Sequence, residues 1–176
     1  TALLAPATIA APAAPDLRLV PRPRTVTVDA GAFQLTGHLR IAVAAGNAED
    51  AFAASLLKEE IESRSSAKTS VVEGAEGEIV LARDAALADA GEQGYRIEVK
   101  PGGVRATARD GAGLFYAVQT LRQMVRAEGI PGATITDRPA LRWRGLQDDV
   151  SRGPVPTVAA LERRIRTAAE YKLNLY

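Results

Sequence analysis

Short apolar runs separated by turn residues dominate the first three quarters of the chain. Residues 24–28 alternate between polar and apolar side chains, which is typical of a strand with one buried face. The clearest pair of strands is 94–99 and 104–108, because the intervening Pro101-Gly102-Gly103 reverses the chain. The same pattern predicts further short strands at 33–35, 39–43, 70–72, 79–82 and 133–136.

Two stretches in the same region instead repeat their apolar residues at helical spacing. The first runs from Ala51 to about Arg64, with Asp50 as its expected N-cap. The second follows Asp110 as N-cap and is expected to end at Gly129. Because these helices do not alternate strictly with the strands, the pattern predicts an α+β fold, a mostly antiparallel sheet with two helices packed on one face.

The pattern changes after Arg142. A strand at 143–147, a loop through Gly153-Pro154 and a helix at about 157–172 form one β-loop-α unit, and 173–176 begin another strand. One unit cannot close a barrel, so the apolar stripe of its helix must pack on the preceding domain, on a second copy or on residues after Tyr176. We favour the last. The polar residues between 147 and 152 follow the strand, where an α/β barrel keeps its ligand-binding groups.

Composition narrows the possible functions. The 176 residues carry 22 Lys and Arg against 21 Asp and Glu, and neither sign forms a block, so nucleic acid is not an expected partner. Without cysteine, and with His38 as the single histidine, a metal site would need carboxylates alone, and we expect neither a metal nor a cofactor. No stretch is long enough to predict a membrane span.

The first residues are rich in alanine and proline. Residues 1–18 therefore fit the remnant of a secretory signal or a linker, which predicts a secreted or periplasmic protein.

Four segments together resemble the family 20 glycoside hydrolases, the β-N-acetylhexosaminidases. They are Val20-Pro21-Arg22-Pro23, Gly94-Tyr95-Arg96-Ile97, the run 110–121, and Ile135-Thr136-Asp137-Arg138-Pro139 leading into Trp143-Arg144-Gly145-Leu146. The resemblance implies a zincin-like N-terminal α+β domain at 19–138. It also implies that 139–176 are the first β/α unit, a stub, of a catalytic (β/α)8 barrel.

The same resemblance suggests where substrate binds. Asp149-Val150-Ser151-Arg152 matches a family motif, Leu-Asp-Val-Ser-Arg-His, whose arginine holds hydroxyls of the terminal sugar. A guanidinium suits this task because its planar fork donates paired hydrogen bonds. Arg152 is thus the candidate substrate-binding residue and Asp149 its orienting partner. The alternative is a surface arginine that at most stiffens its loop. Asp148 and Gly153-Pro154 depart from the motif, which leaves the sugar preference open.

No catalytic residue can be assigned within the chain. The family's catalytic Asp-Glu pair is expected beyond Tyr176. Asp148 and Asp149 do not replace it, since successive strand residues point to opposite faces. The implied function is the non-catalytic N-terminal portion of an enzyme that removes terminal N-acetylhexosamine from glycans or chitooligosaccharides, by a retaining, substrate-assisted mechanism. The expected partners are that glycan and the rest of the same catalytic domain, and the fragment alone should be inactive.

Two other readings remain open. The α+β domain could be a stand-alone scaffold or a carbohydrate-binding module without activity. It could also precede a barrel of another glycosidase family.

Trp143 could stack on a sugar, although we expect it to pack between two domains. Asp110-Gly111-Ala112-Gly113 lacks the lysine of phosphate loops, so helix entry is the expected role.

Overall fold

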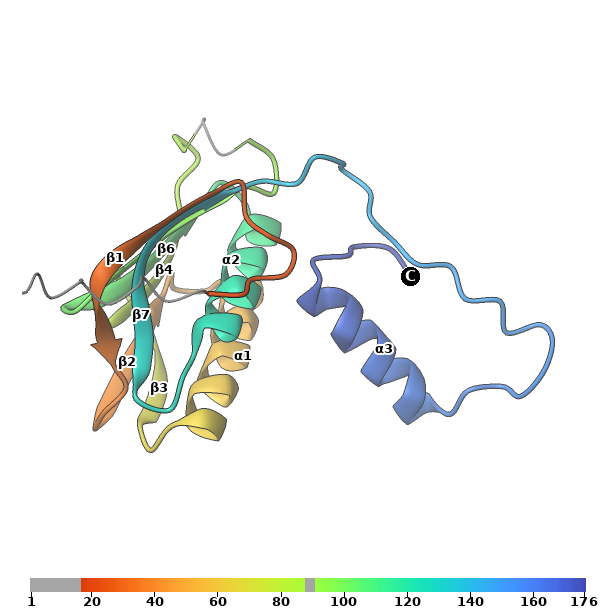
Figure 1. Ribbon diagram of the computed structural model, residues 1–176, viewed down its shortest axis with the longest axis horizontal. Helices are drawn as coiled ribbons and strands as arrows, with labels where there is room; N and C mark the ends of the chain where they lie inside the picture. The colour runs from red at the N-terminus through yellow and green to blue at the C-terminus, as the bar shows by residue number, and fades with distance from the viewer. Residues whose placement is uncertain (1–16, 88–90) are drawn as a thin grey trace, which may run out of the picture.

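A computed structural model describes residues 17–87 and 91–176, which form one sheet, two helices on one of its faces and a separate C-terminal segment with a third helix (Figure 1). The strands are β1 Thr25–Gln34, β2 His38–Val43, β3 Lys68–Glu73, β4 Ile79–Arg83, β5 Tyr95–Lys100, β6 Gly103–Ala108 and β7 Gly129–Asp137. The helices are α1 Ala48–Arg64, α2 Gly111–Met124 and α3 Val158–Glu170. The predicted helices and the strands predicted between 24 and 136 are therefore present, with those at 24–28 and 33–35 joined in the single strand β1. The predicted segment 1–18 lies outside the described residues except for its last two.

The sheet has the order β1-β7-β5-β6-β4-β2-β3. From β1 to β6 the neighbours run antiparallel, including the predicted hairpin of β5 and β6. From β6 to β3 they run parallel. The sheet predicted as mostly antiparallel is thus antiparallel in one half and parallel in the other. Helix α1 carries the chain across from β2 to β3 and makes that pair parallel, a crossover that the strand patterns alone do not reveal.

Both helix boundaries that were predicted from caps need partial correction. Helix α1 begins three residues early, because Asn47 is the N-cap and its side chain accepts from the Asp50 N–H at 3.2 Å. Asp110 does cap α2, accepting from the Gly113 N–H at 2.7 Å. That helix ends at Met124, since Val125 is already extended, and Gly129 opens β7 instead of terminating the helix.

One apolar core lies between the sheet and the two helices. Its fully buried side chains come from the central strands and from the inward faces of α1 and α2, and Leu17 and Leu19 add to it. The largest are Tyr95, Leu35, Ile41, Leu57, Ile61, Ile79, Leu81, Ile97, Leu114, Leu121, Met124 and Ile130.

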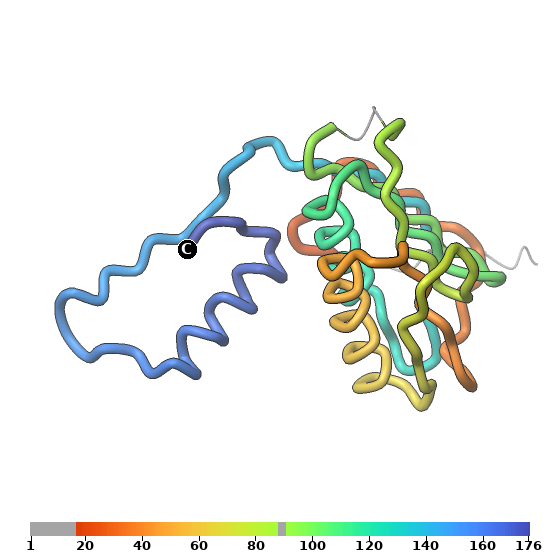
Figure 2. Tube along the Cα trace, turned by 180° about the vertical axis from the view of Figure 1, so that it is seen from behind, coloured from red at the N-terminus to blue at the C-terminus, as the bar shows by residue number. Residues whose placement is uncertain are grey.

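The C-terminal segment lies on the helix side of this domain and reaches it at one end of α3 (Figures 1 and 2). The strand predicted at 143–147 is reduced to one parallel bridge between Gly145 and Leu175. This bridge still gives the expected arrangement, two neighbouring parallel strand starts connected by a helix. Trp143 is 64% exposed, so its predicted packing between two domains is not seen within this chain and stays a prediction. Along the stripe of α3, Ala168 is buried whereas Val158 and Ile165 are exposed.

Candidate functional site

Arg152 and Asp149 lie in the exposed loop that leads into α3. The Asp149 carboxylate accepts from the Ser151 N–H at 2.8 Å, and the Ser151 side chain and backbone together lower the pKa of Asp149. Among the described residues, Arg152 makes no hydrogen bond or ion pair with Asp149. The roles of Arg152 toward a sugar and of Asp149 as its orienting partner stay predictions.

The neighbouring carboxylate of Asp148 has different partners. It forms an ion pair with Arg164 of α3 and accepts a hydrogen bond from the Tyr176 hydroxyl at 3.2 Å. Asp148 therefore ties the loop to α3 and to the end of the chain. Asp148 and Asp149 serve separate contacts and do not converge as an acid/base pair would have to.

A buried polar cluster joins the C-terminal segment to the α+β domain. Lys172 follows α3 with a φ of +60°, and its Nζ reaches the Tyr95 hydroxyl at 2.7 Å and the Asp137 Oδ2 at 3.3 Å. The Tyr95 hydroxyl also lies 3.0 Å from that Oδ2 and 2.7 Å from the Thr120 Oγ1. Tyr95 and Asp137 are register partners on β5 and β7. Side chains of β5, β7 and α2 thus form one cluster, in which Lys172 contacts Tyr95 and Asp137 directly.

Burial decides the electrostatics of this cluster. It lowers the pKa of the Lys172 ammonium, and the Asp137 carboxylate opposes that shift. It also raises the pKa of the Tyr95 phenol, and the negative charge of Asp137 raises it further. A neutral phenol can donate to Asp137 while it accepts from Lys172. The sequence indicated Lys172 only as the end of a helix, although a lysine just past an apolar stripe and before a strand was a usable signal.

Arg144 and Asn174 hold the two strand starts together. The Arg144 Nε donates to the Lys172 carbonyl at 2.9 Å, and its guanidinium lies 5.1 Å from the Tyr116 ring. The Asn174 side chain accepts from the Arg144 N–H and donates to the Arg142 carbonyl, both at 2.8 Å. The Arg144–Asn174 contact therefore holds the segments before and after α3 side by side.

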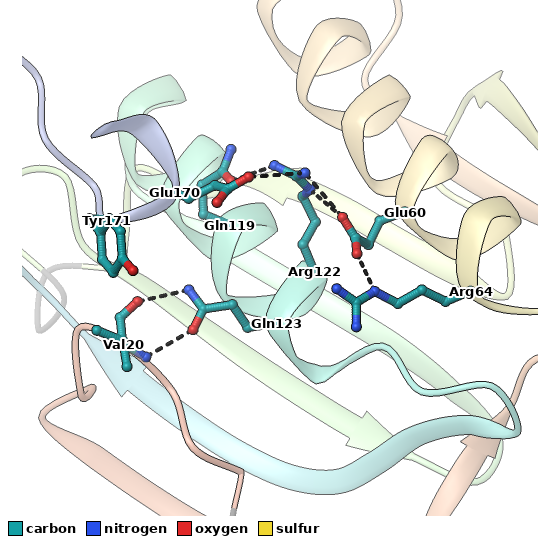
Figure 3. Close-up of a pocket in the computed structure, with 8 residues that line it drawn as sticks. All are labelled: Val20, Glu60, Arg64, Gln119, Arg122, Gln123, Glu170 and Tyr171. Carbon is teal, nitrogen blue, oxygen red and sulfur yellow. Dashed lines mark hydrogen bonds and ion pairs between the residues drawn. The ribbon is translucent and has the colours of Figure 1, made fainter. Parts of the chain in front are cut away.

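Helix α3 has a second attachment, drawn in Figure 3. The Arg122 guanidinium of α2 lies 3.0 Å from the Glu60 carboxylate of α1 and 3.7 Å from that of Glu170 in α3. Beside it, the Gln123 side chain exchanges two hydrogen bonds of 2.8 Å with the Val20 backbone. These residues line a pocket of about 270 Å³.

The described chemistry is that of attachment rather than of bond cleavage. Glu60 and Glu170 line the same pocket, but both face the Arg122 guanidinium, so neither is placed to donate a proton to a leaving group. No group of three or more His, Asp or Glu side chains among the described residues could hold a metal ion. In the same part of the chain, no helix is long and apolar enough to cross a membrane.

Comparisons with known proteins place this geometry in a family. The model of glycosyl hydrolase family 20, domain 2, matches residues 16–138. A β-N-acetylhexosaminidase of Cellulomonas fimi is 35% identical over 170 residues, which cover 92% of this chain and 34% of that protein. An N,N'-diacetylchitobiase of Vibrio harveyi is 36% identical over 83 residues, 46% of this chain and 9% of that protein.

A solved structure extends the match to the C-terminal segment. The N-acetyl-β-hexosaminidase of Streptomyces plicatus, in complex with Thio-NAglucal, superposes with a TM-score of 0.80 at 33% identity and covers 94% of this chain. That coverage includes most of the β/α unit as well as the α+β domain. The chain spans about one third of the length of these two hexosaminidases.

Proposed function

Because the chain belongs to glycosyl hydrolase family 20, whose domain 2 it carries, we propose that it is the non-catalytic N-terminal portion of a β-N-acetylhexosaminidase. The whole enzyme would remove terminal N-acetylhexosamine from glycans or chitooligosaccharides. It would do so by the retaining, substrate-assisted mechanism of that family.

One observation carries this proposal. The similarity to the Streptomyces plicatus enzyme runs past the α+β domain into the segment with Gly145, α3 and Leu175, where a parallel strand-helix-strand arrangement begins. A scaffold or binding module would need only the α+β domain, which already encloses its own core.

Within the proposed enzyme the described residues would position and bind. The buried cluster around Lys172 would set the first barrel strands on the α+β domain, and the Arg144–Asn174 contact would hold these strands together. The exposed Arg152 is free to offer its fork of N–H donors to sugar hydroxyls. The proton donor and the group that orients the acetamido carbonyl would come from later strands.

Activity assays on two lengths of protein test the proposal. The 176-residue chain should leave a chromogenic N-acetyl-β-glucosaminide intact, whereas a protein extended to the length of the hexosaminidases should cleave it with retention of configuration. Cleavage by the short chain would contradict a non-catalytic role. If the extended protein cleaved neither the glucosaminide nor the galactosaminide, the proposal that the chain is part of a β-N-acetylhexosaminidase would be wrong.

Arg152 can be tested in the extended protein. Arg152→Ala should lower kcat/KM by roughly 10- to 100-fold, the loss expected for hydrogen bonds from a charged donor. Arg163→Ala, which removes an exposed arginine from α3, is the matched control and should leave kcat/KM unchanged. If the Arg152→Ala enzyme kept the wild-type kcat/KM, Arg152 would be a surface arginine of the loop that does not bind the sugar.

Three finer features belong to the same proposal. The similarity to a chitobiase supports chitooligosaccharides as a substrate class. The Ala/Pro-rich start of the chain supports export to the periplasm or the medium. The zincin-like description of the α+β domain and its limits at 19 and 138 rest on the family resemblance. Titration with chitobiose would show whether the short chain binds sugar by itself.

A further inference from the structure

A second pocket, separate from Arg152, lies where the C-terminal segment meets the α+β domain. It encloses about 300 Å³ and is lined by the rings of Tyr95, Tyr116 and Pro139, together with several basic side chains. This is the lower end of the size range of small-molecule sites.

The charge of this pocket is strongly unbalanced. Arg22, Arg24, Arg138, Arg144 and Lys172 line it, against the single carboxylate of Asp137. That carboxylate is already occupied, because it accepts from Lys172, from the Tyr95 hydroxyl and from the Arg24 backbone N–H. None of the four arginines has a carboxylate partner among the described residues. Four guanidinium groups around one small space favour an anion.

Two buried atoms in the pocket lining lack a hydrogen-bond partner among the described residues. They are the Arg144 Nη2, a donor, and the Gln93 Oε1, an acceptor. The two side chains meet at one carbonyl, since the Gln93 Nε2 and the Arg144 Nη1 both donate to the Arg142 oxygen, at 3.3 and 3.2 Å. The bond to Arg142 also fixes which end of the Gln93 amide is the oxygen.

These features specify the chemistry of an occupant. The Arg144 Nη2 requires an acceptor and the surrounding positive charge favours a negative one, whereas the Gln93 Oε1 requires a donor such as a hydroxyl. We propose that this Gln93–Arg144 pocket binds a small hydroxylated carboxylate, such as a sugar acid. The site is independent of the proposed hydrolysis, which concerns neutral N-acetyl sugars.

Backbone amide NMR of the 176-residue chain tests the site directly. Sodium glucuronate, acetate and glucose are titrated at fixed ionic strength, because attraction between exposed charges is screened by salt. Glucuronate should give saturable shifts at the amides of Gln93, Tyr95 and Arg144. Acetate, which has the charge without hydroxyls, should bind more weakly. Glucose, which has hydroxyls without the charge, should produce no saturable shift.

Three variants sharpen the experiment. Arg138→Gln removes a guanidinium that makes no hydrogen bond to the described residues, so the fold should persist. It should weaken glucuronate binding about five- to tenfold, as expected for one charge-assisted hydrogen bond. Gln93→Met should abolish the preference for glucuronate over acetate. Arg105→Gln, an equal charge change on the exposed face of β6, is the control and should change nothing.

Several outcomes would overturn the proposal. Equal weakening by Arg138→Gln and Arg105→Gln would show nonspecific attraction to a basic surface. Equal binding of acetate and glucuronate by the unaltered chain would remove the role of Gln93. Absence of saturable shifts with glucuronate would remove the site, and would leave the hydrolase assignment untouched because that assignment is tested by substrate cleavage.

Discussion

The two parts of the chain are held in place by different forces. From Leu17 to Asp137, apolar side chains of the sheet and of α1 and α2 form one buried core. From 139 onward, Leu141, Val155 and Ile165 are at least half exposed, and the segment has two buried residues, Ala168 and Lys172. Its attachment relies on the contacts of Lys172 with Tyr95 and Asp137, of Glu170 with Arg122, and of the Arg144 guanidinium with the Tyr116 ring. Burial makes the first part stable, and a few hydrogen bonds and ion pairs place the second part on it.

The largest expected effect comes from truncating one isoleucine in each part. Ile97→Ala removes a fully buried side chain from β5 and should lower the free energy of unfolding by about 2–5 kcal/mol. Ile165→Ala on α3 removes a side chain that is 50% exposed and should change it by less than about 0.5 kcal/mol. Urea denaturation followed by circular dichroism measures both. A similar loss in the two variants would show that α3 is packed as firmly as the core.

Replacing Lys172 tests the polar attachment. Lys172→Met leaves the Asp137 carboxylate buried without its cation, which costs roughly 3 kcal/mol when one partner of a buried pair is removed. The loss should appear as faster hydrogen exchange at 139–176, while amides of β5 and α2 stay protected. Lys68→Met, an exposed lysine on β3, is the matched control. Unchanged protection of 139–176 would mean that Arg122 and Glu170 suffice to hold the segment.

The local elements of both parts could be predicted from the sequence because they follow from periodicity. Alternation located β5 and β6, and apolar residues at helical spacing located α1, α2 and α3. Asp110 was predicted as an N-cap because its helix had few competing caps nearby. For α1, Asn47 and Asp50 are both good caps, and the choice depended on Asp50 being buried against Arg83, a contact 33 residues away.

The junction between the parts could not be predicted in the same way. Tyr95, Thr120, Asp137 and Lys172 are scattered over 78 positions, and their meeting depends on the strand order and on where α3 ends. Arg152 was predicted as a sugar-binding residue only through a family motif, since an exposed arginine leaves no periodic signal. The predicted packing of Trp143 between two domains also stays a prediction, since within this chain its ring lies exposed beside the Arg142 guanidinium.

Each part has a helix with an N-cap side chain, so the loss of an N-cap can be compared between the two parts. Asp110→Ala removes an acceptor for the N–H groups of Gly113 and Gln93 and should cost about 1–2 kcal/mol of global stability. Thr157→Ala removes an acceptor for the Ala160 N–H and should only fray the start of α3. Thermal unfolding and hydrogen exchange separate these results. A global loss from Thr157→Ala would make α3 part of the cooperative unit.

The smallest effect is a pH dependence confined to the α+β domain. The Glu62 carboxylate accepts from the Lys58 ammonium at 2.6 Å and from the Thr69 N–H at 2.8 Å, and these bonds lower the pKa of Glu62 from 4.5 to about 2. A lowered folded-state pKa contributes stability that is present above the unfolded value and is lost as pH falls through the folded one. The destabilisation caused by Glu62→Gln should therefore shrink between pH 4.5 and about 2.

Two further substitutions test whether this pH dependence comes from contacts that form only when the chain folds. Glu59→Gln, on the exposed face of α1, is the matched control that removes a carboxylate outside the Lys58 and Thr69 contacts. Asp149 also has a lowered pKa, but its hydrogen bonds come from Ser151, two residues away, and such a local turn can persist in the unfolded chain. Asp149→Asn should then leave acid unfolding unchanged. If it instead altered the acid transition as Glu62→Gln does, the loop that carries Arg152 would be ordered by folding of the whole chain.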